Sequence, residues 1–217
     1  MPEDAVTDLT EMLAVHDCLR HEFARMPLTV KAVPEGDSAR ALALGEHILL
    51  MMSVLQAHDE GEDLLIWSLL SERNPEQAAL VATMAGEHEE LLVDMAIIRD
   101  EVAAWIANPS IMERSALHTT LIRLEKELLR HLAIEEQQVA PLIMSHLTQD
   151  EIAAAGAHTL ASLTPEQVSV AIGLILKNTS AERGAAILQG LPAGTLATFE
   201  ESGRAVYAAY AERLSDY

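Results

Sequence analysis

Apolar residues recur every three or four positions through four long segments in the first two thirds of the chain. This spacing predicts four amphipathic helices. Long helices joined by short turns predict an all-α fold, an up-down-up-down four-helix bundle. Prolines and capping residues place the first helix end near Pro27, the second helix between Ser38 and Asn74, the third helix end at Asn108 and the fourth helix start at Ser110, with an extended connection over residues 27–37.

Beyond residue 147 the predicted helices are shorter and richer in Ala and Gly. Helix starts are predicted at Thr148, Thr164 and Ser180, and the sequence from Leu191 to Gly194 predicts a loop before a last helix. We therefore expect a bundle over residues 1–147 and an α-helical C-terminal extension over residues 148–217. The extension would pack on the bundle, cap one of its ends, or form the interface of a homodimer or a contact with a partner protein.

Six polar residues interrupt the apolar faces of the four predicted bundle helices. His58 and Glu62 are four residues apart, as are His131 and Glu135, so each pair lies on one face of its helix. Two further histidines lie alone on the first and third helices. The six candidate metal ligands are His16, His58, Glu62, His88, His131 and Glu135.

The depth of these residues in the bundle tests whether they can form one site. Residues that face each other in an antiparallel pair lie equally far from the connecting turn. By this measure His58 and His88 agree to within ~3 Å, and His88 and His131 agree to within about one helical turn. The first helix would have to end ~15 Å short of its partner to bring His16 to the same level, and the extended connection could span that gap.

A metal centre explains the set better than a purely structural polar network, which is the alternative for any single buried histidine. Two carboxylates in an apolar bundle core cost several kcal/mol each unless cations neutralise them. Six ligands are more than a tetrahedral zinc site holds, and thiolates are absent. Nitrogen and oxygen ligands together suit iron or manganese. Two carboxylates can also bridge a pair of ions, so a dinuclear site is expected.

Composition limits the partners. The net charge of −20 and the pI near 4.6 argue against nucleic acid or an anionic membrane surface, because both would repel the chain. No apolar run approaches the ~18 residues of a membrane span, and no basic leader opens the chain. The single cysteine, Cys18, fits a reducing compartment. These features predict a cytoplasmic protein.

The order of the candidate ligands, His, His-x-x-x-Glu, His and His-x-x-x-Glu, resembles that of the bacterial hemerythrin-like (HHE cation-binding) proteins. The segments AHDEGEDLL, GEHEELL and HLAIEEQQVAPL are also similar to that family. The resemblance spans roughly residues 4–146. It implies a hemerythrin-like bundle with two iron ions in a non-haem centre, bridged by the two glutamates and an oxo or hydroxo group, whose ligand is O2, NO or peroxide.

One departure bears on the activity. The oxygen-carrying hemerythrins have a second histidine on the third helix and an aspartate in the last motif. Here Met84 and Leu92 stand four residues from His88, and the last carboxylate is Glu135. The resemblance therefore favours peroxide or nitric oxide detoxification, as a catalase-like or NO peroxidase-like di-iron oxidoreductase, over oxygen carriage. An oxygen or redox sensor, or an iron donor, is the alternative, and an iron store ranks last.

Other polar residues have simpler expected roles. His47 lies about 16 Å along the helix from His58, so we expect a core or end-of-bundle histidine. His21, His118, His146 and His158 are expected at the surface or an interface. Some of Glu60, Asp63, Glu87, Glu89, Glu90 and Glu136 would accept hydrogen bonds from the ligand imidazoles, and Met51, Val54, Met84 and Leu92 would line the pocket or belong to the core.

Overall fold

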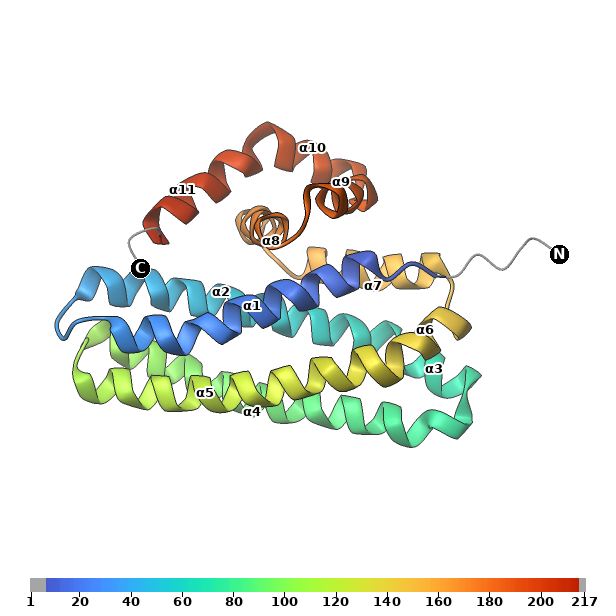
Figure 1. Ribbon diagram of the computed structural model, residues 1–217, viewed down its shortest axis with the longest axis horizontal. Coiled ribbons are helices and arrows are strands. Elements are labelled where there is room, and N and C mark those ends of the chain that lie inside the picture. Colours follow the sequence, from blue (N-terminus) through green and yellow to red (C-terminus); the bar gives the residue numbers. More distant parts are fainter. Residues whose placement is uncertain (1–6, 215–217) are drawn as a thin grey trace.

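The computed structural model describes residues 7–214, and every regular element in that range is a helix. Four long helical segments form an antiparallel bundle, and a group of shorter helices covers one side of it (Figure 1). The prediction of an all-α helical bundle is confirmed. The bundle consists of α1 (Thr10–Ala32), α2 (Ser38–Leu65) with α3 (Trp67–Arg73), η1 (Pro75–Gln77) with α4 (Ala78–Ala107), and α5 (Ile111–Ile134) with η2 (Glu135–Val139) and α6 (Ala140–His146).

The bundle core is divided into two apolar clusters. The larger one contains Phe23, Met51 and Trp105, and the smaller one contains Trp67 and Met84. On the first three helical segments the candidate ligands lie between the residues of one cluster and those of the other, and on the fourth they lie at the boundary, with His131 beside Leu132 of the larger cluster and Glu135 before Val139 of the smaller one. Apolar packing on both sides therefore holds the polar residues at one level of the bundle.

The predicted end of the first helix is wrong. Helix α1 continues through Pro27 to Ala32, and the connection shortens to residues 33–37. A proline inside a helix removes one hydrogen bond, but the buried face runs from Met26 through Pro27 to Val30, and tertiary packing outweighs the local preference. The depth mismatch between His16 and His58 falls to four residues, or ~6 Å.

The other boundaries follow the sequence more closely. The side chains of Ser110, Thr148, Thr164 and Ser180 each accept a hydrogen bond from a backbone N–H of the following helix, as predicted. The loop predicted over residues 191–194 is shorter, because Ala193 and Gly194 already belong to a helix. The C-terminal elements are α7 (Gln149–Ala161), α8 (Pro165–Lys177), α9 (Ala181–Gly190), α10 (Ala193–Thr198), η3 (Phe199–Gly203) and α11 (Arg204–Leu214).

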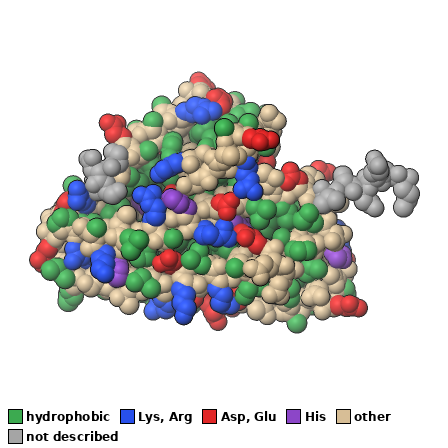
Figure 2. Space-filling view, in the orientation of Figure 1, with side chains coloured by type: hydrophobic (Ala, Val, Ile, Leu, Met, Phe, Trp, Pro, Cys, Tyr) green, Lys and Arg blue, Asp and Glu red, His purple; other side chains and the backbone are tan. Residues whose placement is uncertain are grey.

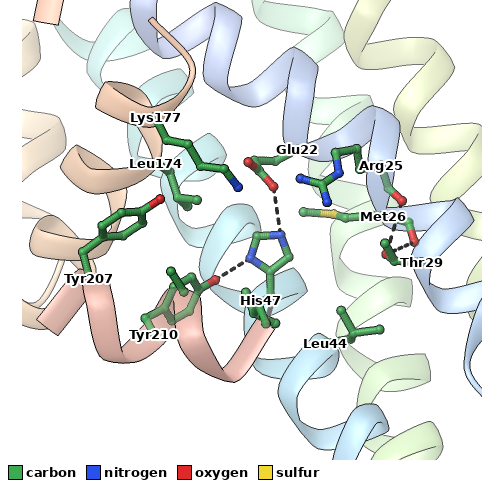
Figure 3. A pocket seen from close by; sticks show the side chains of 12 residues that line it. Glu22, Arg25, Met26, Thr29, Leu44, His47, Leu174, Lys177, Tyr207 and Tyr210 are labelled. Carbon is green, nitrogen blue, oxygen red and sulfur yellow. Dashed lines mark hydrogen bonds and ion pairs between the residues drawn. The ribbon is translucent and has the colours of Figure 1, made fainter. Parts of the chain in front are cut away.

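The C-terminal helices are attached to α1 and α2. His47 of α2 lies between Tyr210 of α11 and Glu22 of α1 (Figure 3). The Glu22 carboxylate is 3.3 Å from the Nε2 atom of His47. The Tyr210 hydroxyl is hydrogen-bonded to the His47 Nδ1 atom on the other side of the ring. Arg183 of α9 also pairs with Asp17 of α1 at 3.0 Å. The interpretation of His47 as a core histidine agrees with its burial.

The surface charges and one long apolar helix bear on whether the protein contacts a membrane. On the face shown in Figure 2, basic and acidic side chains are interspersed, and no continuous basic surface forms. The combined helix Ser38–Arg73 is long and apolar enough to cross a membrane, contrary to the prediction from the sequence. Of its most apolar window 56% is buried inside the bundle, as in the core helix of a soluble protein, so this is weak evidence for a membrane span.

Candidate metal centre

The four predicted histidines form two pairs in the middle of the bundle. The Nε2 atoms of His16 and His58 are 3.0 Å apart, and those of His88 and His131 are 3.1 Å apart. All four residues are buried. The pairing joins α1 to α2 and α4 to α5, so each helical segment of the bundle contributes one imidazole.

The two predicted glutamates each connect the histidine pairs. The Glu62 carboxylate lies 3.3 Å from His58 Nε2 through one oxygen and 3.7 Å from His88 Nε2 through the other. The Glu135 Oε2 atom lies 3.5 Å from His16 Nε2 and 3.7 Å from His131 Nε2. The structure thus brings all six predicted residues together, and each carboxylate spans both imidazole pairs.

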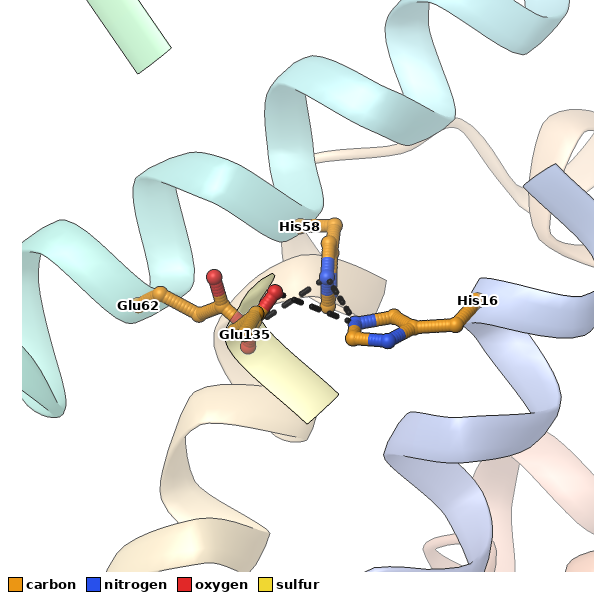
Figure 4. A group of neighbouring side chains, drawn as sticks. All are labelled: His16, His58, Glu62 and Glu135. Atoms are coloured by element: carbon orange, nitrogen blue, oxygen red, sulfur yellow. Dashed lines mark hydrogen bonds and ion pairs between the residues drawn. The ribbon is translucent and has the colours of Figure 1, made fainter. Parts of the chain in front are cut away.

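Figure 4 shows the His16 side of the site. His58 and Glu62 extend from one face of α2, His16 extends from α1 toward them, and Glu135 enters from the opposite side. Ligand atoms of these four residues all lie within 4.8 Å of one another, which is close enough for one ion.

Three carboxylates around the site set the orientation of the imidazoles. Nδ1 of His16 is 3.1 Å from Glu136, Nδ1 of His88 is 2.9 Å from Asp63, and Nδ1 of His131 is 3.0 Å from Glu87. A carboxylate accepts the Nδ1 proton and leaves the Nε2 lone pair of a neutral ring directed into the site. The expectation that some of the neighbouring acids play this role agrees with the structure for these three.

The remaining three acids do not contact a ligand imidazole. Glu60 accepts a hydrogen bond from Gln56, and Glu89 and Glu90 are exposed on α4. Two of the orienting carboxylates also contact an arginine: Arg20 lies 2.8 Å from the Glu136 oxygen that faces His16, and Arg130 lies 2.6 Å from the other oxygen of Glu87. The charge of each carboxylate is therefore shared between an arginine outside and an imidazole inside.

The residues present fit a bound cation on two observations. First, the Nε2 lone pairs of His88 and His131 face each other at 3.1 Å while both Nδ1 atoms donate to carboxylates, an arrangement that a cation between them relieves. Second, all four carboxylate oxygens of Glu62 and Glu135 are buried without a hydrogen-bond partner. Buried carboxylates are normally paired or bound to metal.

The electrostatics of the site without a metal follow from burial. Burial and the neighbouring Glu135 raise the pKa of Glu62 well above its ordinary value. Burial and the charges of His16, His88 and His131 lower the pKa of His58. Burial opposes protonation of His16 as well, but Glu135 and Glu136 hold its pKa above the ordinary value. Without a metal, burial thus disfavours the ionised Glu62 and the protonated His58, and a cation would favour the ionised carboxylate.

Asp59 is a candidate ligand that the sequence analysis missed. Its carboxylate is buried, both oxygens lack a hydrogen-bond partner, and Oδ1 lies 3.9 Å from His88 Nε2. It forms a second possible ligand group with Glu62 and His88. Burial raises its pKa to about 7. The signal in the sequence was its position three residues before Glu62, a spacing that also shares a helix face.

A π-helical turn carries Glu135. The α5 helix widens at residues Glu135–Val139 before α6 begins at Ala140. Pro141 follows at the second position of α6, where it cannot donate the backbone hydrogen bond that an unbroken α-helix would use. Such single π turns accommodate an interrupted hydrogen-bond ladder and are frequent at functional sites.

The predictions for the pocket-lining residues and the remaining histidines agree with the structure except at Leu92. Val54 lines a cavity beside the site, while Met51 and Met84 are buried in the core. Leu92 is 37% exposed on α4, so its assignment to the pocket or the core was wrong; it lies one residue beyond the buried Leu91 and faces outward. His21 is exposed, and His118, His146 and His158 are half-buried, which agrees with a surface or interface position.

Comparison with known proteins was made by family, by curated sequence and by solved structure. No curated protein and no solved structure matches the chain. A family model described as "Hemerythrin HHE cation binding domain" matches residues 7–143, which include all six predicted ligands and Asp59. With this match over more than half of its length, and with histidine and glutamate groups able to hold a metal at its centre, the chain belongs to the hemerythrin HHE cation-binding family.

Proposed function

We propose that this chain is a non-haem di-iron protein that binds O2, NO or hydrogen peroxide and detoxifies peroxide or nitric oxide. The observation that carries the proposal is the arrangement of Glu62 and Glu135, each of which reaches both histidine pairs. Two carboxylates that span two imidazole pairs suit two adjacent ions. Iron is the metal that combines this ligand set with redox chemistry.

In such a centre His16 and His58 would hold one iron, His88 and His131 would hold the other, and Glu62 and Glu135 would be shared between them. Asp59 would complete the second set, which lacks the additional histidine that the oxygen-carrying hemerythrins have on the corresponding helix. The orienting carboxylates of Glu136, Asp63 and Glu87 hold the imidazoles, and the two apolar clusters keep bulk water away. A bound di-iron centre would supply electrons and open coordination positions for the oxidant.

Metal analysis tests this proposal directly. The full chain purified without added metal should contain about two irons, as in other carboxylate-rich bundle sites. His58→Ala and His131→Ala should lower the iron content, whereas His21→Ala, a change at an exposed histidine, should leave it unchanged. Iron content that is substoichiometric and insensitive to both site variants would refute the di-iron assignment.

An oxygen or redox sensor is the second candidate, and one observation favours it. The C-terminal helices contact α1 and α2, which carry His16 and His58, so a rearrangement at the site could reach a surface used by a partner or by a second copy. Rapid disproportionation of hydrogen peroxide by the iron-loaded chain would support the enzyme. Reversible spectral change with oxygen and no peroxide turnover would support the sensor.

The cellular setting forms part of the same proposal. We place the protein in the cytoplasm because its strong net negative charge and single buried thiol suit a soluble protein in a reducing compartment. Fractionation of cells that produce the full chain would test the assignment. Recovery in the membrane fraction would contradict it.

A further inference from the structure

A cavity of about 250 Å³ lies between the bundle and the C-terminal helices. We name it the lateral cavity. Its lining comes from α1, α2, α7, α8 and α9, together with the loop at Leu191 and Pro192. The lining includes buried His58 and Glu62 as well as the exposed residues Gly156 and Pro192, so the cavity connects the candidate metal centre with the surface.

The wall of the lateral cavity is strongly apolar. Aliphatic side chains supply most of it, among them Val15, Leu160, Ile172, Ile175, Ile187 and Pro192. The Thr159 hydroxyl in this wall already donates to the backbone carbonyl of Ala57 at 3.1 Å. The polar groups at the inner end are the ones described above, His58 and Glu62. The cavity therefore has an apolar body and one polar end.

The lateral cavity is larger and more apolar than a small oxidant requires. An apolar cavity of ~150 Å³ already accommodates benzene and stays dry, whereas a water-sized molecule needs only ~30 Å³. Hydrogen peroxide gains nothing from aliphatic walls, because it requires hydrogen-bond partners along its path. The volume and lining instead suit a molecule with an apolar chain of about eight heavy atoms.

We propose that the lateral cavity binds an uncharged aliphatic molecule whose polar end lies at His58 and Glu62, which makes alkyl hydroperoxides the substrate class of this site. The binding step rests on the cavity alone, and the substrate class also rests on the proposed di-iron function. In this proposal the C-terminal helices form most of the binding site for the aliphatic chain, because they supply most of the cavity wall.

Charge around the cavity selects a neutral molecule over a fatty-acid anion. Glu62 lies at the inner end, and Glu11 of α1 stands in the lining near α9. Asp59 and Glu135 are close to Glu62, and the chain as a whole carries a net charge of −20. In the metal-free chain a carboxylate head group would lose its hydration in this apolar cavity and would meet Glu11, whereas a hydroperoxide carries no charge.

The reaction balances with the electrons of the proposed centre. Cleavage of the O–O bond of an alkyl hydroperoxide gives the alcohol and water, and it consumes two protons and two electrons. Two ferrous ions that become ferric supply the electrons for one turnover, and solvent supplies the protons. The alcohol product is itself an uncharged aliphatic molecule, so it serves as a stable probe of the binding step.

Calorimetric titration of the full chain with 1-octanol tests the binding step. We expect saturable binding of one molecule per chain, with affinity rising about fourfold per added methylene from 1-butanol to 1-octanol. In the metal-free chain octanoate should bind at least about tenfold more weakly, because the apolar cavity removes water from its carboxylate. Absence of saturable octanol binding, or octanoate binding of equal strength, would overturn the proposal.

Two pairs of variants localise the binding. Val15→Phe enlarges a side chain of the cavity wall, and Val93→Phe makes the same change at a residue of α4 that is 62% exposed. Gly156→Leu adds a side chain at the outer part of the cavity, and Gly194→Leu is its control; a Cβ added to either glycine meets no atom within 4 Å, so both variants should fold. Each cavity variant should weaken octanol binding by at least about tenfold, and neither control should. Octanol binding that survives Gly156→Leu and Val15→Phe would refute the assignment.

The iron-loaded chain then separates this inference from the proposed function. In a single turnover, octyl hydroperoxide should oxidise the diferrous chain with a second-order rate constant at least about tenfold above that of tert-butyl hydroperoxide, because more methylenes are buried. Iron and peroxide activity without octanol binding would defeat the cavity proposal alone. Octanol binding in a chain that holds no iron would leave the cavity proposal standing and would defeat the di-iron function together with the hydroperoxide assignment.

Discussion

Thr159 of α7 lies directly over Gly61 of α2. A Cβ atom added to Gly61 would stand 3.1 Å from the Thr159 hydroxyl and 3.1 Å from the Ala155 carbonyl oxygen. Gly61 is also the residue before Glu62 in the segment that carries His58 and Asp59. This contact between the C-terminal helices and the bundle therefore falls within the stretch of helix that supplies three of the seven candidate ligands.

A side chain at Gly61 should loosen this attachment. We expect Gly61→Val to lower the free energy of unfolding by roughly 1–3 kcal/mol, because the added carbons enter a packed contact. Gly61→Ala should be close to neutral, since a helix propensity gain of up to ~1 kcal/mol offsets the tight contact. Urea denaturation followed by circular dichroism measures both changes.

Gly86 provides the matched control for Gly61. It also lies inside a bundle helix, but a Cβ added there meets no atom within 4 Å. Gly86→Val should leave the stability unchanged or raise it slightly. A loss of stability equal to that of Gly61→Val would show that the effect comes from the helix backbone and not from the contact with α7.

The clustering of the six candidate residues was predictable because they form a regular polar pattern on otherwise apolar helix faces. His58 and Glu62, like His131 and Glu135, share a helix face through their four-residue spacing, and the structure brings them to one level with His16 and His88. Single-helix periodicity is sufficient for that inference. It also gave the helical fold and most helix starts, where a capping side chain marks the first turn.

The errors arose where tertiary packing decides the outcome. Pro27 favours a helix end locally, but the buried residues beyond it keep α1 intact. Asp59 is one of several acids next to ligands, and only the packing of α2 against α4 separates it from exposed Glu89 and Glu90. The π turn at Glu135 depends on the neighbouring helices and Pro141, so helical periodicity did not reveal it.

The orienting carboxylates should control metal affinity. Glu87→Gln and Glu136→Gln replace the acceptors of the His131 and His16 Nδ1 protons, and each should weaken iron binding by about 10–100-fold. Glu90→Gln is the control, because Glu90 is exposed on the same helix as Glu87. Competition with a chelator of known affinity measures the effect. Equal affinities in all three variants would exclude an orienting role.

The hydrogen bond between Tyr210 and His47 should anchor α11 to the bundle. Tyr210→Phe removes the hydroxyl that is hydrogen-bonded to His47 Nδ1 and leaves that buried nitrogen without its partner, at a cost of roughly 1–3 kcal/mol. We expect faster proteolysis of α11 in this variant. Tyr207→Phe on the same helix is the control, and similar proteolysis of the two variants would contradict the anchoring role.

Removal of the metal should make stability depend on the Asp59 carboxyl. Burial raises its pKa from 3.8 to about 7, so between these values the folded metal-free chain holds a proton that the unfolded chain has released. Stability should therefore fall as the pH rises from about 4 to about 7, by a contribution on the order of 4 kcal/mol from this group. Glu62, His16 and His88, whose pKa values are also raised, act in the same direction.

The lowered pKa values of His58 and His131 act in the opposite direction, because the unfolded chain takes up protons there as the pH falls through about 6.5. Asp59→Asn isolates the carboxyl from these histidines. Urea denaturation of the metal-free chains at pH 5 and pH 7.5 should show a smaller loss of stability with rising pH in Asp59→Asn than in the unmodified chain. Iron should remove the loss in the unmodified chain, because a bound cation stabilises the ionised carboxylate. An identical pH dependence in both metal-free chains would show that Asp59 ionises normally and lies outside the site.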